Sequence, residues 1–177
     1  FARERDHREL RTPGQDVLHQ EPARGDVNRD VDLGDLLERL TTIKAEARET
    51  ADLPALALAL DAELHLHHRA ANVEAIQRLF AEMRECAAVG PPEAACVCFT
   101  GLAMNVLFGD PEEGLRAARR AVEIAKAGDA SAAQHLLRAQ SRLIVVLLYR
   151  GRCFLSENAE TIREGAIRAK SSGDLFL

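Results

Sequence analysis

From Asp32 onward, the sequence repeats one unit of organisation, an amphipathic helical stretch closed by a helix-breaking signal. Apolar residues recur three or four positions apart within each stretch, as on the buried face of a surface helix. Glycine, proline and aspartate stand between the stretches, where they end one helix and cap the next. The pattern predicts consecutive helices over residues 33–50, 53–69, 72–88, 92–108, 111–127, about 130–151 and about 156–172.

Composition favours an all-α fold. Apolar residues make up 47% of the 177 residues, whereas aromatic residues make up 4% and tryptophan is absent. Alanine and leucine dominate the apolar fraction, and both favour helices. The one β-rich run, Leu143–Tyr149, lies inside a longer helical pattern, so no strand is expected.

The stretch Gly109–Asp129 carries both start and stop signals of a helix. Asp110 is placed to cap the first turn, and Gly128 follows the last turn, where we expect a left-handed stop. Gly114 and Ala121 are small residues two turns apart on this helix. They predict that a neighbouring helix approaches closely.

Helix-breaking signals also separate pairs of helices at nearly regular intervals. They lie near Asp52, Pro91, Asp129 and Asp174, which are 39, 38 and 45 residues apart. A fixed period of this length, with two helices in each interval, is typical of helical repeats. The three expected helix pairs cover about residues 53–90, 91–128 and 129–173.

The segment Phe108–Asp129, with the sequence FGDPEEGLRAARRAVEIAKAGD, resembles the second helix of a tetratricopeptide (TPR) repeat and the Gly-Asp turn before it. The longer spacing resembles MalT-like helical regions of bacterial transcriptional regulators and signalling ATPases. The resemblance covers residues 33–177 and implies a right-handed α-solenoid of antiparallel helix pairs, about three repeats plus partial ones at the ends. The first helices depart from the family pattern at Gly101-Leu102 and at Asn105, and an irregular helical bundle with accidental periodicity is the alternative.

The two ends of the chain differ from this repeat domain. Residues 1–31 mix both charge signs with few large apolar side chains, so we expect a flexible or poorly ordered lead-in. The first residue is Phe, and the final Leu175, Phe176 and Leu177 would be exposed unless more chain or another copy covers them. We therefore expect a fragment of a larger protein or a homo-oligomer.

Charge, cysteine content and missing motifs exclude several classes of function. A net charge of −5 opposes direct binding of nucleic acid, and the apolar run Leu53–Leu60 is too short to span a membrane. The four cysteines form no CxxC pair, which favours a reducing cytoplasm and small core residues. The signatures of nucleotide-binding, hydrolase and zinc-protease sites are absent, so neither catalysis nor a cofactor is expected.

The resemblance implies that the first helix of each pair lines an inner groove. Arg138 and Arg142 belong to the most basic segment, 130–155, which also holds Arg150 and Arg152 and no acidic residue. Such a segment is either a solvated face or a site for a carboxylate or an acidic peptide. The expected ligand or partner groove comprises Asp61, His65, His68, Arg69, Phe99, Ala103, Arg138, Ser141, Arg142, Val145 and Tyr149.

Asp61, His65 and His68 share one helix face at spacing i, i+4, i+7 and form a weak candidate for a divalent metal site. No Cys or Glu is obviously placed to complete a tetrahedral site. The simpler interpretation is a polar face of a solenoid helix, and no metal site is expected.

These observations lead to three functional hypotheses. The first is a protein–protein interaction, scaffold or sensor module within a larger bacterial signalling or transcriptional regulator. The second is a stand-alone TPR-like adaptor that binds an acidic peptide. The third is a helical-repeat RNA-binding protein, which the negative charge and the scarcity of aromatic residues oppose.

Overall fold

The computed structural model describes residues 32–152 and 155–172, and every regular element within them is an α-helix. The all-helical class predicted from the sequence is confirmed. The lead-in at 1–31, Cys153 and the apolar residues at 175–177 lie outside the described residues. The helices are α1 (Leu33–Glu49), α2 (Leu53–Arg69), α3 (Val73–Val89), α4 (Pro92–Leu102), α5 (Asn105–Phe108), α6 (Pro111–Ala127), α7 (Ala130–Ala133), α8 (Leu136–Tyr149) and α9 (Ser156–Ser172).

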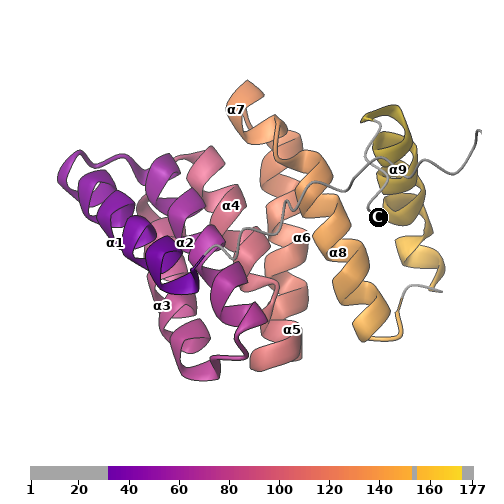
Figure 1. Ribbon diagram of the computed structural model, residues 1–177. Coiled ribbons are helices and arrows are strands. Elements are labelled where there is room, and N and C mark those ends of the chain that lie inside the picture. Colours follow the sequence, from indigo (N-terminus) through magenta and orange to yellow (C-terminus); the bar gives the residue numbers. More distant parts are fainter. Residues whose placement is uncertain (1–31, 153–154, 173–177) are drawn as a thin grey trace, which may run out of the picture. The chain divides into compact units, whose positions relative to one another are not determined.

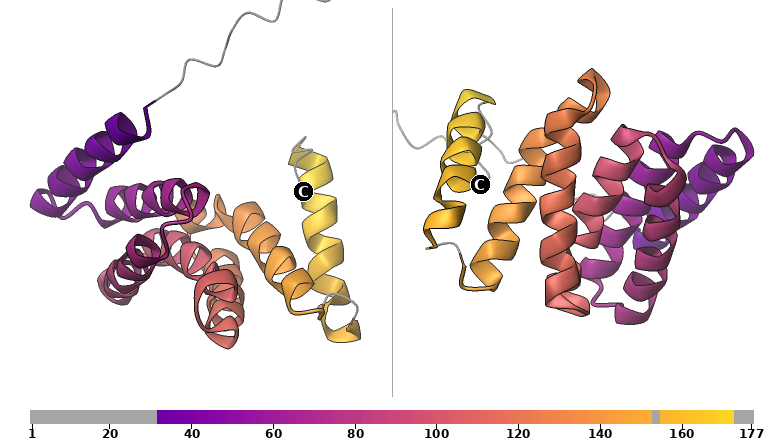
Figure 2. Two further views of the ribbon diagram at one scale, coloured as in Figure 1. Left: turned by 60° about the horizontal axis from the view of Figure 1, so that its bottom comes forward. Right: turned by 180° about the vertical axis from the view of Figure 1, so that it is seen from behind.

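The helices pack in neighbouring pairs that follow chain order within the unit Asp32–Leu177 (Figures 1 and 2). α2 packs against α1, α3 and α4, and α4 packs against α3 and α6. α8 packs against α6, α9 and, to a smaller extent, α4. Each long helix therefore contacts its neighbouring long helices along the chain.

Polar side chains cap the N-termini where the sequence predicts helix starts. Asp110 accepts a hydrogen bond from the backbone N–H of Glu112 at 2.9 Å, as expected for a capping residue. The residue before each of four other helices also caps the N-terminus of that helix with its side chain. These capping residues are Asp32, Asp52, Asn72 and Asp129.

The left-handed stop predicted at Gly128 is wrong. Gly128 has φ −77° and ψ 178°, which is extended backbone, and a Cβ there would lie 2.5 Å from the Cβ of Ala132. Glycine is therefore required by close packing rather than by a positive φ. Left-handed residues end other helices instead, namely Ala51 (φ 55°), Ala71 (φ 53°) and Gly151 (φ 63°).

The single helix predicted over residues 92–108 is broken into α4 and α5. At the break the backbone hydrogen bonds tighten to three-residue spacing, because Met104 N–H donates to the Gly101 carbonyl at 2.9 Å. The buried Asn105 then donates to Glu113 Oε2 at 3.0 Å, which ties the start of α5 to the first turn of α6.

The helix predicted over residues 130–151 is broken in the same way into α7 and α8. Gln134 and His135 form the break, and both side chains face Glu93 in the first turn of α4. Gln134 Nε2 donates to Glu93 Oε1 at 3.0 Å, while His135 Nε2 lies 3.6 Å from the same oxygen. Contacts between helices, which the local pattern does not encode, accompany both breaks.

Gly114 and Ala121 allow the close helix approach that their spacing predicts. A Cβ on Gly114 would lie 2.6 Å from the backbone nitrogen of Val106, so α6 contacts the α4–α5 break directly. Ala121 is buried, and its carbonyl oxygen lies 3.5 Å from the Cys96 sulfur of α4. The expectation of close packing is confirmed on this face of α6.

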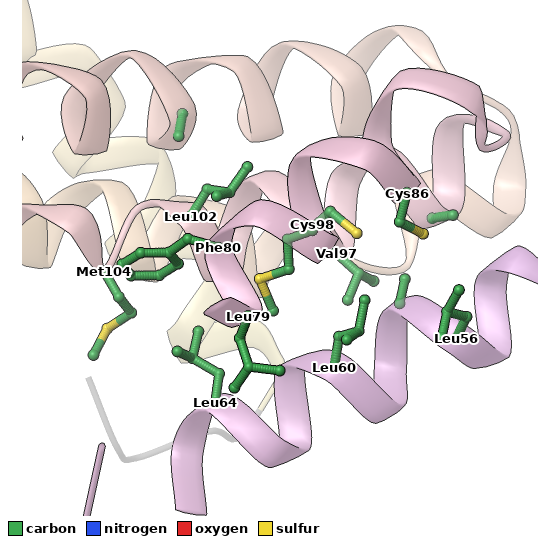
Figure 3. Packing of buried hydrophobic residues seen from close by; sticks show 14 of the residues in the cluster. Leu56, Leu60, Leu64, Leu79, Phe80, Cys86, Val97, Cys98, Leu102 and Met104 are labelled. Atoms are coloured by element: carbon green, nitrogen blue, oxygen red, sulfur yellow. The ribbon is translucent and has the colours of Figure 1, made fainter. Parts of the chain in front are cut away.

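Two clusters of buried apolar residues hold the helices together. In the first, Leu56, Leu60 and Leu64 of α2 point toward side chains of α3 and α4 (Figure 3). Phe80 of α3 is fully buried among them. The second cluster joins α4, α6 and α8. Burial of each large apolar side chain contributes about 1.5–3 kcal/mol, so these clusters stabilise the packed helices.

Candidate functional site

Asp61 on α2 is the acidic centre of the candidate site. Its side chain is only 4% exposed, and its Oδ2 atom accepts a hydrogen bond from the Arg138 guanidinium of α8. The other carboxylate oxygen, Oδ1, is buried without a hydrogen-bond partner among the described residues. Because a buried carboxylate needs a compensating charge, the Asp61 side chain depends on Arg138 within the fold.

His65, one turn after Asp61, continues the cluster. Its Nδ1 atom lies 2.8 Å from the Asp61 backbone carbonyl, and its Nε2 atom lies 3.3 Å from Arg142 Nη2. A carbonyl accepts and a guanidinium donates, so both contacts are satisfied when Nδ1 carries the proton and Nε2 accepts. His65 thus lies between the backbone of α2 and the Arg142 side chain of α8.

Arg142 is a cation without a carboxylate of its own. Its Nη1 atom lies 2.7 Å from the Met104 sulfur, and no carboxylate of residues 32–152 or 155–172 lies within ion-pair distance of its guanidinium. Burial lowers the pKa of Arg142 from its ordinary value, the charge of Asp61 opposes that shift, and Arg138 adds to it. Arginine nevertheless stays charged in proteins, so Arg142 retains the capacity to bind an anion.

A groove between α8 and α9 adjoins these two arginines. Its volume is about 480 Å³, and Arg138 and Arg142 stand among side chains that are mostly apolar. Ser141 lines the groove too, although its hydroxyl donates to the Leu137 carbonyl of the same helix at 2.9 Å. The other lining residues are Ile144, Val145, Leu148, Ile162 and Ala166.

The structure thus brings together Asp61, His65, Arg138 and Arg142 from two helices far apart in sequence. Ser141 and Val145 line the groove beside the two arginines, whereas the other predicted site residues lie elsewhere. The His68 ring contacts Phe108 edge-on, with centroids 5.3 Å apart. Arg69 is exposed at the end of α2, Ala103 is buried at the α4–α5 break, and Tyr149 is 64% exposed at the end of α8. Phe99 lines a different groove, between α3 and α6.

The basic segment 130–155 is divided by the fold. Arg150 and Arg152 both form ion pairs with Glu112 in the first turn of α6, away from Arg138 and Arg142. Met104 belongs to the site, but sequence reasoning missed it. A methionine between two helical stretches is most often a core residue, and nothing in its local sequence distinguishes it.

Possible metal ligands and free thiols both occur among the described residues. In the part of the chain that the structure describes, no three His, Cys, Asp or Glu side chains come together so as to hold a metal ion. Cys86, Cys96 and Cys98 are buried free thiols, as expected of core residues. Burial raises the pKa of the Cys96 thiol to about 11, which disfavours the reactive thiolate.

Comparison with protein-family models, curated proteins and solved structures found no match. No described helix combines the length and the apolar character that crossing a bilayer requires.

Proposed function

We propose that residues 33–177 form a TPR-like interaction module, a right-handed solenoid of antiparallel helix pairs. The packing order supports this, because α4 contacts both α2 and α3, and α8 contacts both α4 and α6. A helix that contacts both members of the preceding pair is what stacked repeats require. In this proposal the module belongs to a larger bacterial signalling or transcriptional regulator of the cytoplasm.

A series of ion pairs between the second helices of successive pairs also supports the stacked arrangement. Each pair joins a basic residue of one helix to a glutamate of the next, with distances of 2.6–2.7 Å. Surface ion pairs of this kind contribute little stability individually. They support the proposal only because they indicate which helices are neighbours. The pairs are Arg48–Glu82, Arg84–Glu113 and Lys126–Glu164.

We further propose that the module binds an acidic peptide segment in the groove between α8 and α9. The observation that carries this proposal is Arg142, a guanidinium with no carboxylate partner beside an apolar groove. A peptide carboxylate would supply a charge-assisted hydrogen bond to Arg142, and a neighbouring apolar side chain would fill the groove.

Binding of fluorescein-labelled acidic peptides tests the proposal. The peptides carry two glutamates beside a leucine, and matched peptides carry lysines in place of the glutamates. We expect Arg142→Gln to weaken acidic-peptide binding about tenfold or more, since hydrogen bonds to charged groups contribute about 1.5–3 kcal/mol. Arg163→Gln is the matched control, because Arg163 is an exposed arginine of α9 outside the groove. Equal affinity of the Arg142→Gln variant and the native protein would refute the proposal.

A further inference from the structure

A second groove lies between α3 and α6 and shares no lining residue with the groove between α8 and α9. Its volume is about 640 Å³, within the range of about 300–1,000 Å³ that is usual for ligand pockets. Phe99 and Leu102 of α4 line it, and α4 packs against both α3 and α6. The groove therefore has α3 and α6 as its two sides, and side chains of α4 line it between them.

Apolar and small side chains form much of its lining. Phe99 is half-buried and contributes a partly accessible ring, while Ala87 and Ala88 of α3 and Ala117 of α6 are small. Small residues on helices let another helix approach closely, because ridges of its side chains can fit between them. The lining thus suits an inserted apolar side chain.

Arg84 and Glu113 meet at one side of the groove and link α3 to α6. Arg84 of α3 donates through Nε to Glu113 Oε1 of α6 at 2.8 Å, and Glu113 Oε2 accepts from Asn105 at 3.0 Å. Glu113 therefore ties α6 to both α3 and α5.

Charge distinguishes this groove from its counterpart one helix pair earlier. Four arginines line it, with two glutamates, although the whole chain has a net charge of −5. The counterpart between α1 and α3 is lined by one arginine and two glutamates, and its volume is about 250 Å³. The larger volume and the excess of arginine over glutamate among the lining side chains are thus local features of the groove between α3 and α6. Its charged residues are Arg84, Arg116, Arg119, Arg120, Glu113 and Glu123.

Two of these arginines are well placed to exchange partners. Arg116 lies 3.5 Å from Asp110, and both side chains are more than half exposed. Arg120 pairs with Glu123 on the same helix at 3.1 Å, also in an exposed position. Exposed pairs contribute about 0–1 kcal/mol, so a carboxylate from a partner can replace either one at small cost.

We propose that the groove between α3 and α6 docks an amphipathic helix of a partner protein. The apolar face of that helix contacts Phe99 and the alanines, and acidic residues along its edge pair with Arg116 and Arg120. A helix is favoured over an extended segment because the lining comes from helices and the described residues offer no sheet edge for strand addition.

A displayed library of helix-constrained random peptides, selected on the full chain, tests this proposal. We expect enriched peptides to place apolar residues at i, i+3 or i+4 and i+7, with an excess of Asp and Glu beside them. Fluorescence anisotropy of an enriched peptide should show at least tenfold weaker binding to Ala88→Trp, which fills the groove from an exposed position, and to Arg120→Glu. Arg39→Glu, an exposed charge reversal on α1, is the matched control and should leave affinity unchanged.

Three results would overturn the proposal. One is the absence of enrichment, and another is equal binding by Ala88→Trp and the native chain. The third is self-association in sedimentation that Ala88→Trp abolishes, because a second copy would then occupy the groove. Arg142→Gln is expected to leave peptide binding here intact, so the outcome is separable from the test of the groove between α8 and α9.

Discussion

Arg138 on α8 donates a hydrogen bond to Asp61 on α2, a residue 77 positions earlier in the chain. The two partners differ in environment, because the Asp61 side chain is 4% exposed and the Arg138 side chain is 41% exposed. The carboxylate therefore depends on this ion pair for compensation, whereas the guanidinium can be solvated. The pair consequently contributes to fold stability as well as to the candidate site.

This asymmetry predicts unequal effects of removing each partner. Arg138→Ala leaves a buried carboxylate unpaired and should lower the free energy of unfolding by about 1–3 kcal/mol. Asp61→Ala should cost less, because Arg138 can turn toward water. Urea denaturation of both variants and of the double variant measures the coupling between the two side chains. A double variant less stable than Arg138→Ala alone would contradict this account.

Close packing at Gly114 predicts a second effect on stability. Gly114→Ala places a methyl group 2.6 Å from the Val106 backbone nitrogen, which cannot move without shifting α5. We expect a loss of about 1–3 kcal/mol, as for other overpacked sites. The melting temperature or the urea midpoint reports the change.

Gly165→Ala is the matched control for Gly114→Ala, since Gly165 is also a buried glycine within a helix. Its added methyl group would lie 2.8 Å from the Cδ1 atom at the end of the flexible Ile144 side chain and at an ordinary contact distance, 3.8 Å, from the Gln140 Cβ. Replacing a glycine inside a helix by alanine stabilises the helix by about 0.5–1 kcal/mol, and this gain should offset the cost of that contact. If Gly165→Ala were as damaging as Gly114→Ala, backbone proximity would not explain the effect.

The sequence predicted those features of the fold that depend on local signals. The Asp110 cap and the close approach at Gly114 follow from short-range patterns, and both are present. The breaks at Met104 and Gln134 do not follow from such patterns, because bonds to other helices accompany them. A uniform helical period continues through both breaks. Periodicity alone therefore predicts one helix in place of α4 and α5, and one in place of α7 and α8.

The part of the candidate site that could be predicted lies on the first helix of each expected helix pair. Spacing placed Asp61 with His65 and Arg138 with Arg142, and the resemblance to a TPR repeat assigned both pairs to one groove. The fold brings these pairs into direct contact. It places Phe99 in the groove between α3 and α6, because the rotation of α4 about its axis depends on packing that one sequence does not specify.

The left-handed residues that end α1 and α2 predict stabilising substitutions. Ala51 and Ala71 have φ values of 55° and 53°, a conformation in which an L-residue with a Cβ is strained. Ala51→Gly should raise the free energy of unfolding by about 0.5–1 kcal/mol, and Ala71→Gly should act similarly. Ala45→Gly, an exposed site inside α1, should instead lower it by about the same amount. Destabilisation by Ala51→Gly in urea denaturation would refute the prediction.

The ion pair between Lys126 and Glu164 predicts a loss of stability in acid. The hydrogen bond from Lys126, at 2.7 Å, and its charge lower the pKa of Glu164 below its ordinary value. The unfolded chain therefore binds a proton at Glu164 more readily, with a pKa of about 4.3. The contribution of this pair is complete above that value and is lost as the pH falls through the lower pKa of the folded state. Urea denaturation from about pH 7 to about pH 2.5 measures this effect. At neutral pH the urea midpoint of the native protein should be higher than the midpoints of Glu164→Gln and Lys126→Met. Both differences should become smaller as the pH falls. A difference that stayed constant across this range would show that the carboxylate charge of Glu164 contributes nothing to the fold.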